Sequence, residues 1–170
     1  MEAFVAHVQE RATVDPELRL QHALELAFRS LGRRDRTVLE MRRFLEGKRV
    51  EPSTIDDALG YLQREGYLDD ARFARQFAED KRLLEEWGAD RIERRLLALG
   101  IPQQLVHEAV AARDRSGELE AASELLRRRF PSLDDDQRER RRAYGVLVRK
   151  GYDSELAWDA IRKHAGAADH

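Results

Sequence analysis

An internal repeat of 51 residues limits the possible folds of this chain more than any other feature of its sequence. Shifting the sequence by 51 residues, and again by the same amount, superimposes hydrophobic residues of three repeats at five positions: Leu45, Leu96 and Leu147; Met41, Ile92 and Ala143; Ile55, Val106 and Ala157; Ala58, Ala109 and Ala160; Leu59, Val110 and Ile161. The spacing of these residues within each repeat is helical. Because units of about 50 residues are marginally stable alone, neighbouring units are expected to pack on one another. The sequence therefore predicts an all-α fold of three tandem three-helix repeats in an elongated, curved array.

Helical periodicity and helix-ending residues predict nine helices. We expect them over residues 20–31, 35–46, 52–65, 70–87, 90–99, 102–112, 118–130, 136–150 and 154–164. Asp35 is the predicted N-cap of the second helix, and Gly32, Gly47, Gly88, Gly100 and Gly151 are predicted to end helices. The predicted divisions are an N-terminal arm (1–18), repeats at 19–68, 69–113 and 114–165, and a C-terminal tail (166–170).

A rigid corner is predicted where the first repeat meets the second. Gly66 suits the left-handed position just past a helix end, and Tyr67 would fold back over that helix. Leu68 and Phe73 have the spacing of a hydrophobic staple around Asp69, the predicted N-cap of the next helix. The pair Asp69-Asp70 could instead serve a metal or acid–base site, but no histidine or third carboxylate stands nearby, which favours capping.

The bulk properties exclude several classes of protein. Although 38% of the 170 residues are charged, the net charge is only −2. The overall charge therefore does not attract the protein to nucleic acid or membrane. The absence of cysteine excludes disulfides and thiol catalysis. No apolar run has the length of a membrane span or the character of a signal peptide, so we expect a soluble, cytoplasmic protein. Arginine outnumbers lysine 27 to 4, a bias that genomic base composition explains as readily as anion recognition.

No catalytic or cofactor-binding constellation is visible. The five histidines are scattered, and none has a partner at metal-binding helical spacing. The chain also lacks a glycine-rich phosphate loop and a nucleophile motif. We therefore expect a binding protein without enzymatic activity, metal or cofactor.

Basic residues are concentrated in two zones. Residues 19–50 hold nine basic and four acidic groups and residues 137–151 hold six and one, whereas residues 51–90 hold five and eleven. The candidate binding residues lie largely on or beside the second helix of each repeat: Arg33, Arg34, Arg36, Arg42, Arg43, Arg49, Arg91, Arg94, Arg95, Arg138, Arg141, Arg142, Arg149 and Lys150. A solvated face paired with acidic neighbours explains many such clusters. Recurrence at matching repeat positions favours an anionic partner.

Sequence-specific reading of duplex DNA is not expected. In a helix-turn-helix the third helix enters the major groove, but here the third helices of the first and last repeats carry acidic residues such as Asp56, Asp57 and Glu155. Phosphates would repel them. Only Gln103 and Gln104 in the middle repeat could address base edges.

Four blocks of this sequence resemble the RecX family of recombinase regulators. They are the corner with the following Phe73-Ala74, the helix over residues 39–45, the segment from Arg91-Ile92 to Gly100-Ile101, and Leu147 to Gly151-Tyr152. The resemblance implies a protein that lodges in the groove of a RecA filament on single-stranded DNA, and we separately expect a monomer. It also implies that extension is limited, disassembly is favoured, and recombination, ATP hydrolysis and SOS co-protease activity in DNA repair fall.

Two questions remain open from the sequence. The arginines could meet DNA phosphate, including non-specific contacts with duplex, or an acidic protein surface. The alternatives to a filament regulator are a helical-repeat protein that binds DNA without a recombinase and a scaffold for an unrelated protein.

Overall fold

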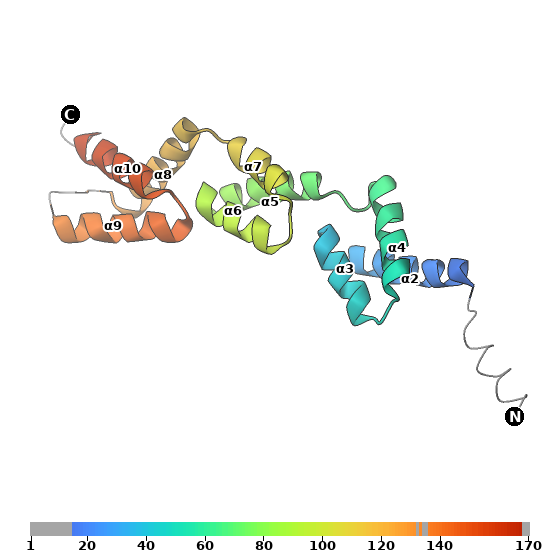
Figure 1. The fold of residues 1–170 in the computed structure, drawn as a ribbon. Helices are drawn as coiled ribbons and strands as arrows, with labels where there is room; N and C mark the ends of the chain where they lie inside the picture. Colours follow the sequence, from blue (N-terminus) through green and yellow to red (C-terminus); the bar gives the residue numbers. More distant parts are fainter. Residues whose placement is uncertain (1–14, 132, 134–135, 168–170) are drawn as a thin grey trace, which may run out of the picture. The chain divides into compact units, whose positions relative to one another are not determined.

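The computed structural model describes residues 15–131, 133 and 136–167, and all regular structure in these residues is α-helical (Figure 1). The predicted helices are present in the predicted order: α2 (Pro16–Leu31), α3 (Val38–Gly47), α4 (Pro52–Arg64), α5 (Asp70–Glu85), α6 (Ala89–Ala98), α7 (Gln103–Ala111), α8 (Arg115–Arg129), α9 (Gln137–Lys150) and α10 (Ser154–Ala167). The predicted all-α class with three three-helix sets is confirmed. Residues 1–14 of the predicted arm and 168–170 of the predicted tail lie outside the described residues.

The helices group into two compact units rather than three equal ones. The first unit runs from Met1 to Phe73 and holds α2, α3 and α4, while the second runs from Ala74 to His170. The boundary falls near the start of α5. The second and third repeats therefore share one unit, which the internal repeat alone does not predict.

The residues that coincide under the 51-residue shift form the cores. Leu45, Leu96 and Leu147 are all completely buried. In the first unit α2 and α3 pack on α4, and in the second unit α10 packs against α8 and α9. Val110 is the exception among the superimposed positions, because it is half-buried while Leu59 and Ile161 are buried.

The corner has the predicted backbone. Gly66 takes a left-handed conformation (φ 75°), its N–H donates to the Gln63 carbonyl at 3.1 Å, and the Tyr67 N–H donates to the Leu62 carbonyl at 2.8 Å. These are the two hydrogen bonds of a Schellman ending. The Tyr67 ring is half exposed and forms a T-shaped pair with Phe28, with 4.8 Å between ring centroids, whereas Leu68 is buried.

Both aspartates of the corner cap helices. Asp69 accepts the Arg72 N–H at 2.8 Å and so caps α5, as predicted. Asp70 accepts the Val38 N–H at 3.0 Å, so it caps the start of α3 from a distant point in the chain. This second role was not predicted. The described residues contain no group of three potential metal ligands, and the capping interpretation accounts for both carboxylates.

Several helix boundaries and one core assignment were predicted wrongly. α2 starts at Pro16 rather than Leu20, since Asp15 accepts the Glu17 N–H and proline suits the first turn. Thr37, not Asp35, caps α3, because it forms a reciprocal capping box with Glu40.

In the first repeat Gly47 lies inside α3, and the left-handed residue that follows this helix is Arg49 (φ 61°). In the second repeat Glu86 (φ 57°) follows α5, and Gly88 is the N-cap of α6 rather than the end of α5. The helical spacing over residues 70–87 also predicts that Phe73 and Leu84 are buried, but Leu84 has 81% of its surface exposed and Phe73 is half-buried. α8 begins at Arg115 because Asp114 accepts the Gly117 N–H.

None of the helices in the described part of the chain combines the length and apolarity needed to cross a bilayer.

Candidate functional site

The C-terminal end of α9 meets the N-terminal end of α6 inside the second unit. The Gly88 N–H donates to the Lys150 carbonyl at 2.9 Å, and the Asp90 N–H donates to the Gly151 carbonyl at 3.0 Å. The unpaired carbonyls of one helix thus satisfy the unpaired amides of the other. A Cβ atom at Gly151 would lie 2.2 Å from the Cβ of Arg91, so this approach requires glycine. We call this contact the helix-end junction.

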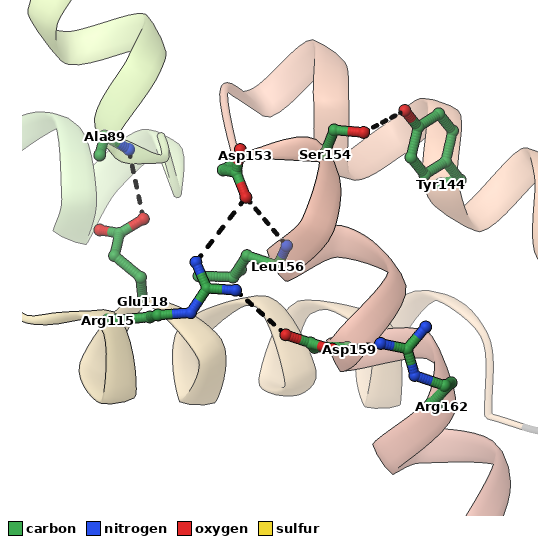
Figure 2. Close-up of polar contacts among 9 residues, drawn as sticks. All are labelled: Ala89, Arg115, Glu118, Tyr144, Asp153, Ser154, Leu156, Asp159 and Arg162. Atoms are coloured by element: carbon green, nitrogen blue, oxygen red, sulfur yellow. Dashed lines mark hydrogen bonds and ion pairs between the residues drawn. The ribbon is translucent and has the colours of Figure 1, made fainter.

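A buried carboxylate reinforces the helix-end junction. Glu118 on α8 accepts the Ala89 N–H of α6 at 3.2 Å (Figure 2) and pairs with Arg113 at 3.5 Å. Arg82 on α5 lies 4.0 Å from the same carboxylate and donates to the Val110 carbonyl of α7 at 2.8 Å. Burial raises the pKa of Glu118 above its ordinary value although its neighbours are cationic. One carboxylate therefore links all three helices of repeat 2 to the first helix of repeat 3.

Ion pairs and hydrogen bonds also join the helices of repeat 3. Arg115 on α8 lies 3.8 Å from Asp153 and donates to Asp159 at 3.1 Å (Figure 2). Asp153 in turn accepts the Leu156 N–H at 3.0 Å and caps α10. These contacts hold α8 against α10, on which α9 also packs.

The helix-end junction places a row of cations beside an aromatic cluster. A groove of about 580 Å³ is lined by Phe77, Lys81, Trp87, Arg91, Arg94, Arg95, Ala98 and Arg149. The Arg91 guanidinium lies 4.1 Å above the Trp87 ring, and its Nη1 donates to the Arg149 carbonyl at 3.1 Å. Stacking and a hydrogen bond therefore hold Arg91 in place.

A second groove continues the row along α9. It measures about 730 Å³ and is lined by Phe130, Asp136, Gln137, Arg138, Arg141, Arg142, Gly145, Val146 and Arg149. Its four arginines are exposed. Among the described residues that line it, only Asp136 is acidic, and this carboxylate accepts the Arg138 N–H at 2.8 Å. Because Arg149 lines both grooves, we treat them together as the basic groove.

The basic groove brings seven of the predicted candidate residues together: Arg91, Arg94, Arg95, Arg138, Arg141, Arg142 and Arg149. The side chain of Lys150 contacts the end of α5 instead. Its Nζ donates to the Glu85 carbonyl at 2.6 Å and lies 3.9 Å from the Glu86 carboxylate. Burial, together with Arg129 and Arg91, lowers the pKa of this ammonium group.

The candidate arginines of repeat 1 divide by their contacts. Arg34 pairs with Glu40 at 3.0 Å and Arg42 with Asp56 at 2.8 Å, so pairing within the protein explains these two. Arg43 and Arg49 are exposed. Arg33 and Arg36 line a smaller pocket in the same unit.

Three residues of the basic groove were missed by sequence reasoning. They are the two aromatic residues Phe77 and Trp87 and the lysine beside them, Lys81. The Lys81 ammonium lies 4.9 Å from the centroid of the Trp87 ring, and the two aromatic rings form a T-shaped pair with 6.2 Å between centroids. Trp87 stands four residues before Arg91, a spacing at which side chains meet on one helix, but α5 ends before Trp87. Only the fold around the helix-end junction reveals the pairing.

The arrangement is suited to binding anions. Guanidinium groups supply forked donors and permanent positive charge, which match phosphate and carboxylate groups. The basic groove therefore presents a surface suited to anion recognition.

Comparisons with known proteins identify relatives along most of the chain. Models of the first, second and third three-helix domains of RecX match residues 23–70, 69–110 and 117–161. The regulatory protein RecX of Deinococcus radiodurans is 37% identical over 142 residues, covering 84% of this chain and 68% of that protein. The regulatory protein RecX of Amycolatopsis mediterranei is 33% identical, covering 89% and 88%.

Solved structures agree with the sequence matches. RecX from Lactobacillus salivarius superimposes with a TM-score of 0.76 at 17% identity, covering 86% of this chain and 96% of that one. A second regulatory protein RecX gives a TM-score of 0.75 at 19% identity, covering 91% and 77%. The order of the three matched domains follows the order of the three helical sets. This chain belongs to the RecX family of regulatory proteins.

Proposed function

We propose that this protein binds a RecA filament on single-stranded DNA and lowers its activity without catalysing a reaction. Extension is limited or disassembly is favoured, so recombination, ATP hydrolysis and SOS co-protease activity fall. The observation that carries the proposal is the basic groove. Seven arginines from α6 and α9 line its two parts, which share Arg149. Its partner would be met in the cytoplasm, where the filament forms, and we propose that the protein acts there as a monomer.

Charge supports an anionic partner for the basic groove. Among the described residues that line the basic groove, seven are arginines and one is acidic, and that one, Asp136, caps α9. Each phosphate neutralised on a single strand releases counterions and contributes about 0.7 to the slope of log K against log salt. Seven arginines are enough for an affinity that falls steeply with salt.

The helix-end junction supports recognition by a rigid surface. Arg91 and Arg149 sit on different repeats yet share a hydrogen bond, so neither repeat can rotate without disturbing the groove. A preorganised surface loses less conformational entropy on binding. We infer that repeats 2 and 3 engage the filament as one body.

The test is the single-stranded-DNA-dependent ATPase of the cognate recombinase, titrated with this protein before and after filament assembly. Wild type should inhibit in both orders, and Arg141→Gln with Arg142→Gln should weaken inhibition about tenfold or more. Arg42→Gln is the matched control, because that arginine already pairs with Asp56. No inhibition by folded wild-type protein in either order would refute the proposal.

A DNA-binding protein acting without a recombinase is the second candidate, and the basic groove favours it equally. It predicts tight, salt-dependent binding to bare single strands by the same groove. Inhibition of the ATPase at protein concentrations that leave bare DNA unbound would exclude it.

A further inference from the structure

A small pocket in the first unit concentrates positive charge apart from the basic groove. It measures about 140 Å³, and its walls include Arg29, Ser30, Arg33, Arg36, Phe44 and Lys48. Four of these side chains are cationic, and none of the described residues that line the pocket carries a carboxylate. We call it the repeat-1 pocket.

Two helices and the link between them build the repeat-1 pocket. Arg29 and Ser30 lie in the last turn of α2, while Phe44 and Lys48 stand four residues apart at the end of α3, a spacing that places both on one face. Arg36 comes from the link between these helices.

Cations gather on one ring of the repeat-1 pocket. The Arg36 guanidinium lies 5.1 Å and the Lys48 ammonium 5.6 Å from the centroid of the Phe44 ring. Both cations are therefore held beside the same ring. An anion bound in the pocket would offset their positive charge.

Two buried donors in the repeat-1 pocket have no partner within the described protein. Ser30 is 3% exposed, and neither its Oγ nor the Nε of Arg36 makes a hydrogen bond there. Buried polar groups in native proteins are nearly always paired, because an unpaired group keeps its desolvation cost. Both groups border the same pocket, so one ligand oxygen cluster could satisfy them together.

We propose that the repeat-1 pocket binds a phosphate monoester or free phosphate. The hydroxyl and guanidinium donate to phosphate oxygens, and the surrounding cations balance a group that carries a charge of about −1.5 to −2 at pH 7. A backbone diester carries less charge, and its strand must continue on both sides. The inference stands independently of the proposed filament regulation. The phosphate is supplied either free in solution or at the phosphorylated end of a nucleic acid strand.

Isotope-labelled full-length protein titrated with inorganic phosphate tests the chemistry by NMR. The amide signals of Ser30, Arg33 and Phe44 should shift and saturate. Arg36→Gln should weaken binding about tenfold or more, as expected for a charged hydrogen-bond donor, and Ser30→Ala should weaken it severalfold. Arg64→Gln is the matched control: it removes one positive charge from an exposed site on α4, and its affinity should stay within twofold.

Single-stranded oligonucleotides with a 5′-phosphate or a 5′-hydroxyl distinguish the two sources. Tighter binding of the phosphorylated strand, lost in Arg36→Gln, would assign the pocket to strand ends. Equal binding of both strands alongside saturable phosphate binding would assign it to free phosphate. Absence of saturable shifts in the pocket, or equal losses in Arg64→Gln, would overturn the proposal. Should Arg36→Gln fail to fold, Ser30→Ala decides, because its hydroxyl makes no hydrogen bond within the protein.

Discussion

Replacing Gly151 by alanine should separate the two helix ends that meet at the helix-end junction. Gly151 has φ 93°, and a Cβ atom there would lie 2.2 Å from the Cβ and 2.6 Å from the backbone nitrogen of Arg91. The obstacle is backbone and an adjoining Cβ, not the end of a flexible side chain. α6 and α9 must therefore move apart.

The expected cost follows from the contacts. A left-handed alanine costs about 1–2 kcal/mol. Separation also removes the two hydrogen bonds from the Gly88 and Asp90 amides, each contributing about 1 kcal/mol. Gly151→Ala should thus lower the free energy of unfolding of the second unit by roughly 3–4 kcal/mol, shifting its urea midpoint by about 1.5–2 M.

The assay is urea unfolding followed by tryptophan fluorescence, since both tryptophans, Trp87 and Trp158, lie in the second unit. Gly66→Ala is the matched control, followed by circular dichroism. Gly66 has a similar φ of 75°, but a Cβ there meets nothing within 4 Å, so only the conformational cost of about 1–2 kcal/mol applies. Equal losses in the two variants would refute the argument that close approach at the helix-end junction matters.

Three further outcomes follow from the described contacts. Thr37→Ala should lower the free energy of unfolding by about 1–2 kcal/mol, because it removes the capping box of α3. Asp35→Ala should change it by less than about 0.5 kcal/mol. Thermal unfolding compares the two variants, and a larger loss in Asp35→Ala would contradict the assignment of Thr37 as the cap. Burial raises the pKa of Glu40, but the hydrogen bonds from Arg34 and the Thr37 amide outweigh it and lower the pKa below its ordinary value of 4.5. The stability from this carboxylate is therefore present above about pH 4.5 and is lost as pH falls through the folded-state pKa. Glu40→Gln should make stability fall less steeply at acid pH. An unchanged acid dependence would show that Glu40 does not contribute to it. Leu84→Gln should leave the free energy of unfolding, measured in urea, unchanged within about 0.5 kcal/mol, since this side chain is 81% exposed, and a larger loss would show that the residue is buried.

Residue pattern predicted much of the local structure correctly. Gly66, Gly100 and Gly151 take left-handed conformations after α4, α6 and α9, because helix endings of this kind need a residue without Cβ strain. Arg49 and Glu86 take the same conformation without being glycine. Such positions carry no residue-type signal, so the ends of α3 and α5 were misplaced.

The sequence predicted which arginines belong to the candidate site, but not which of the predicted arginines face a groove and which pair with a carboxylate. Every arginine of the basic groove was singled out from charge and position in the repeat. Whether an arginine faces a groove or pairs with a carboxylate depends on residues that are distant in the chain, as with Arg42 and Asp56. The same holds for Lys150, whose side chain contacts Glu85 on another helix. It also holds for the repeat-1 pocket, because its unpaired donors come from separate segments of the chain.

The sequence by itself determined the helices, their division into three sets and the family, because these depend on periodicity and on motifs within about 50 residues. Tertiary structure decided how the repeats are joined. Gly88 and Gly151 are 63 positions apart, and nothing in either local segment shows that their backbones touch. That contact joins repeats 2 and 3 and aligns the arginines of α6 with those of α9, because hydrogen bonds between helix ends form only when the whole chain has folded.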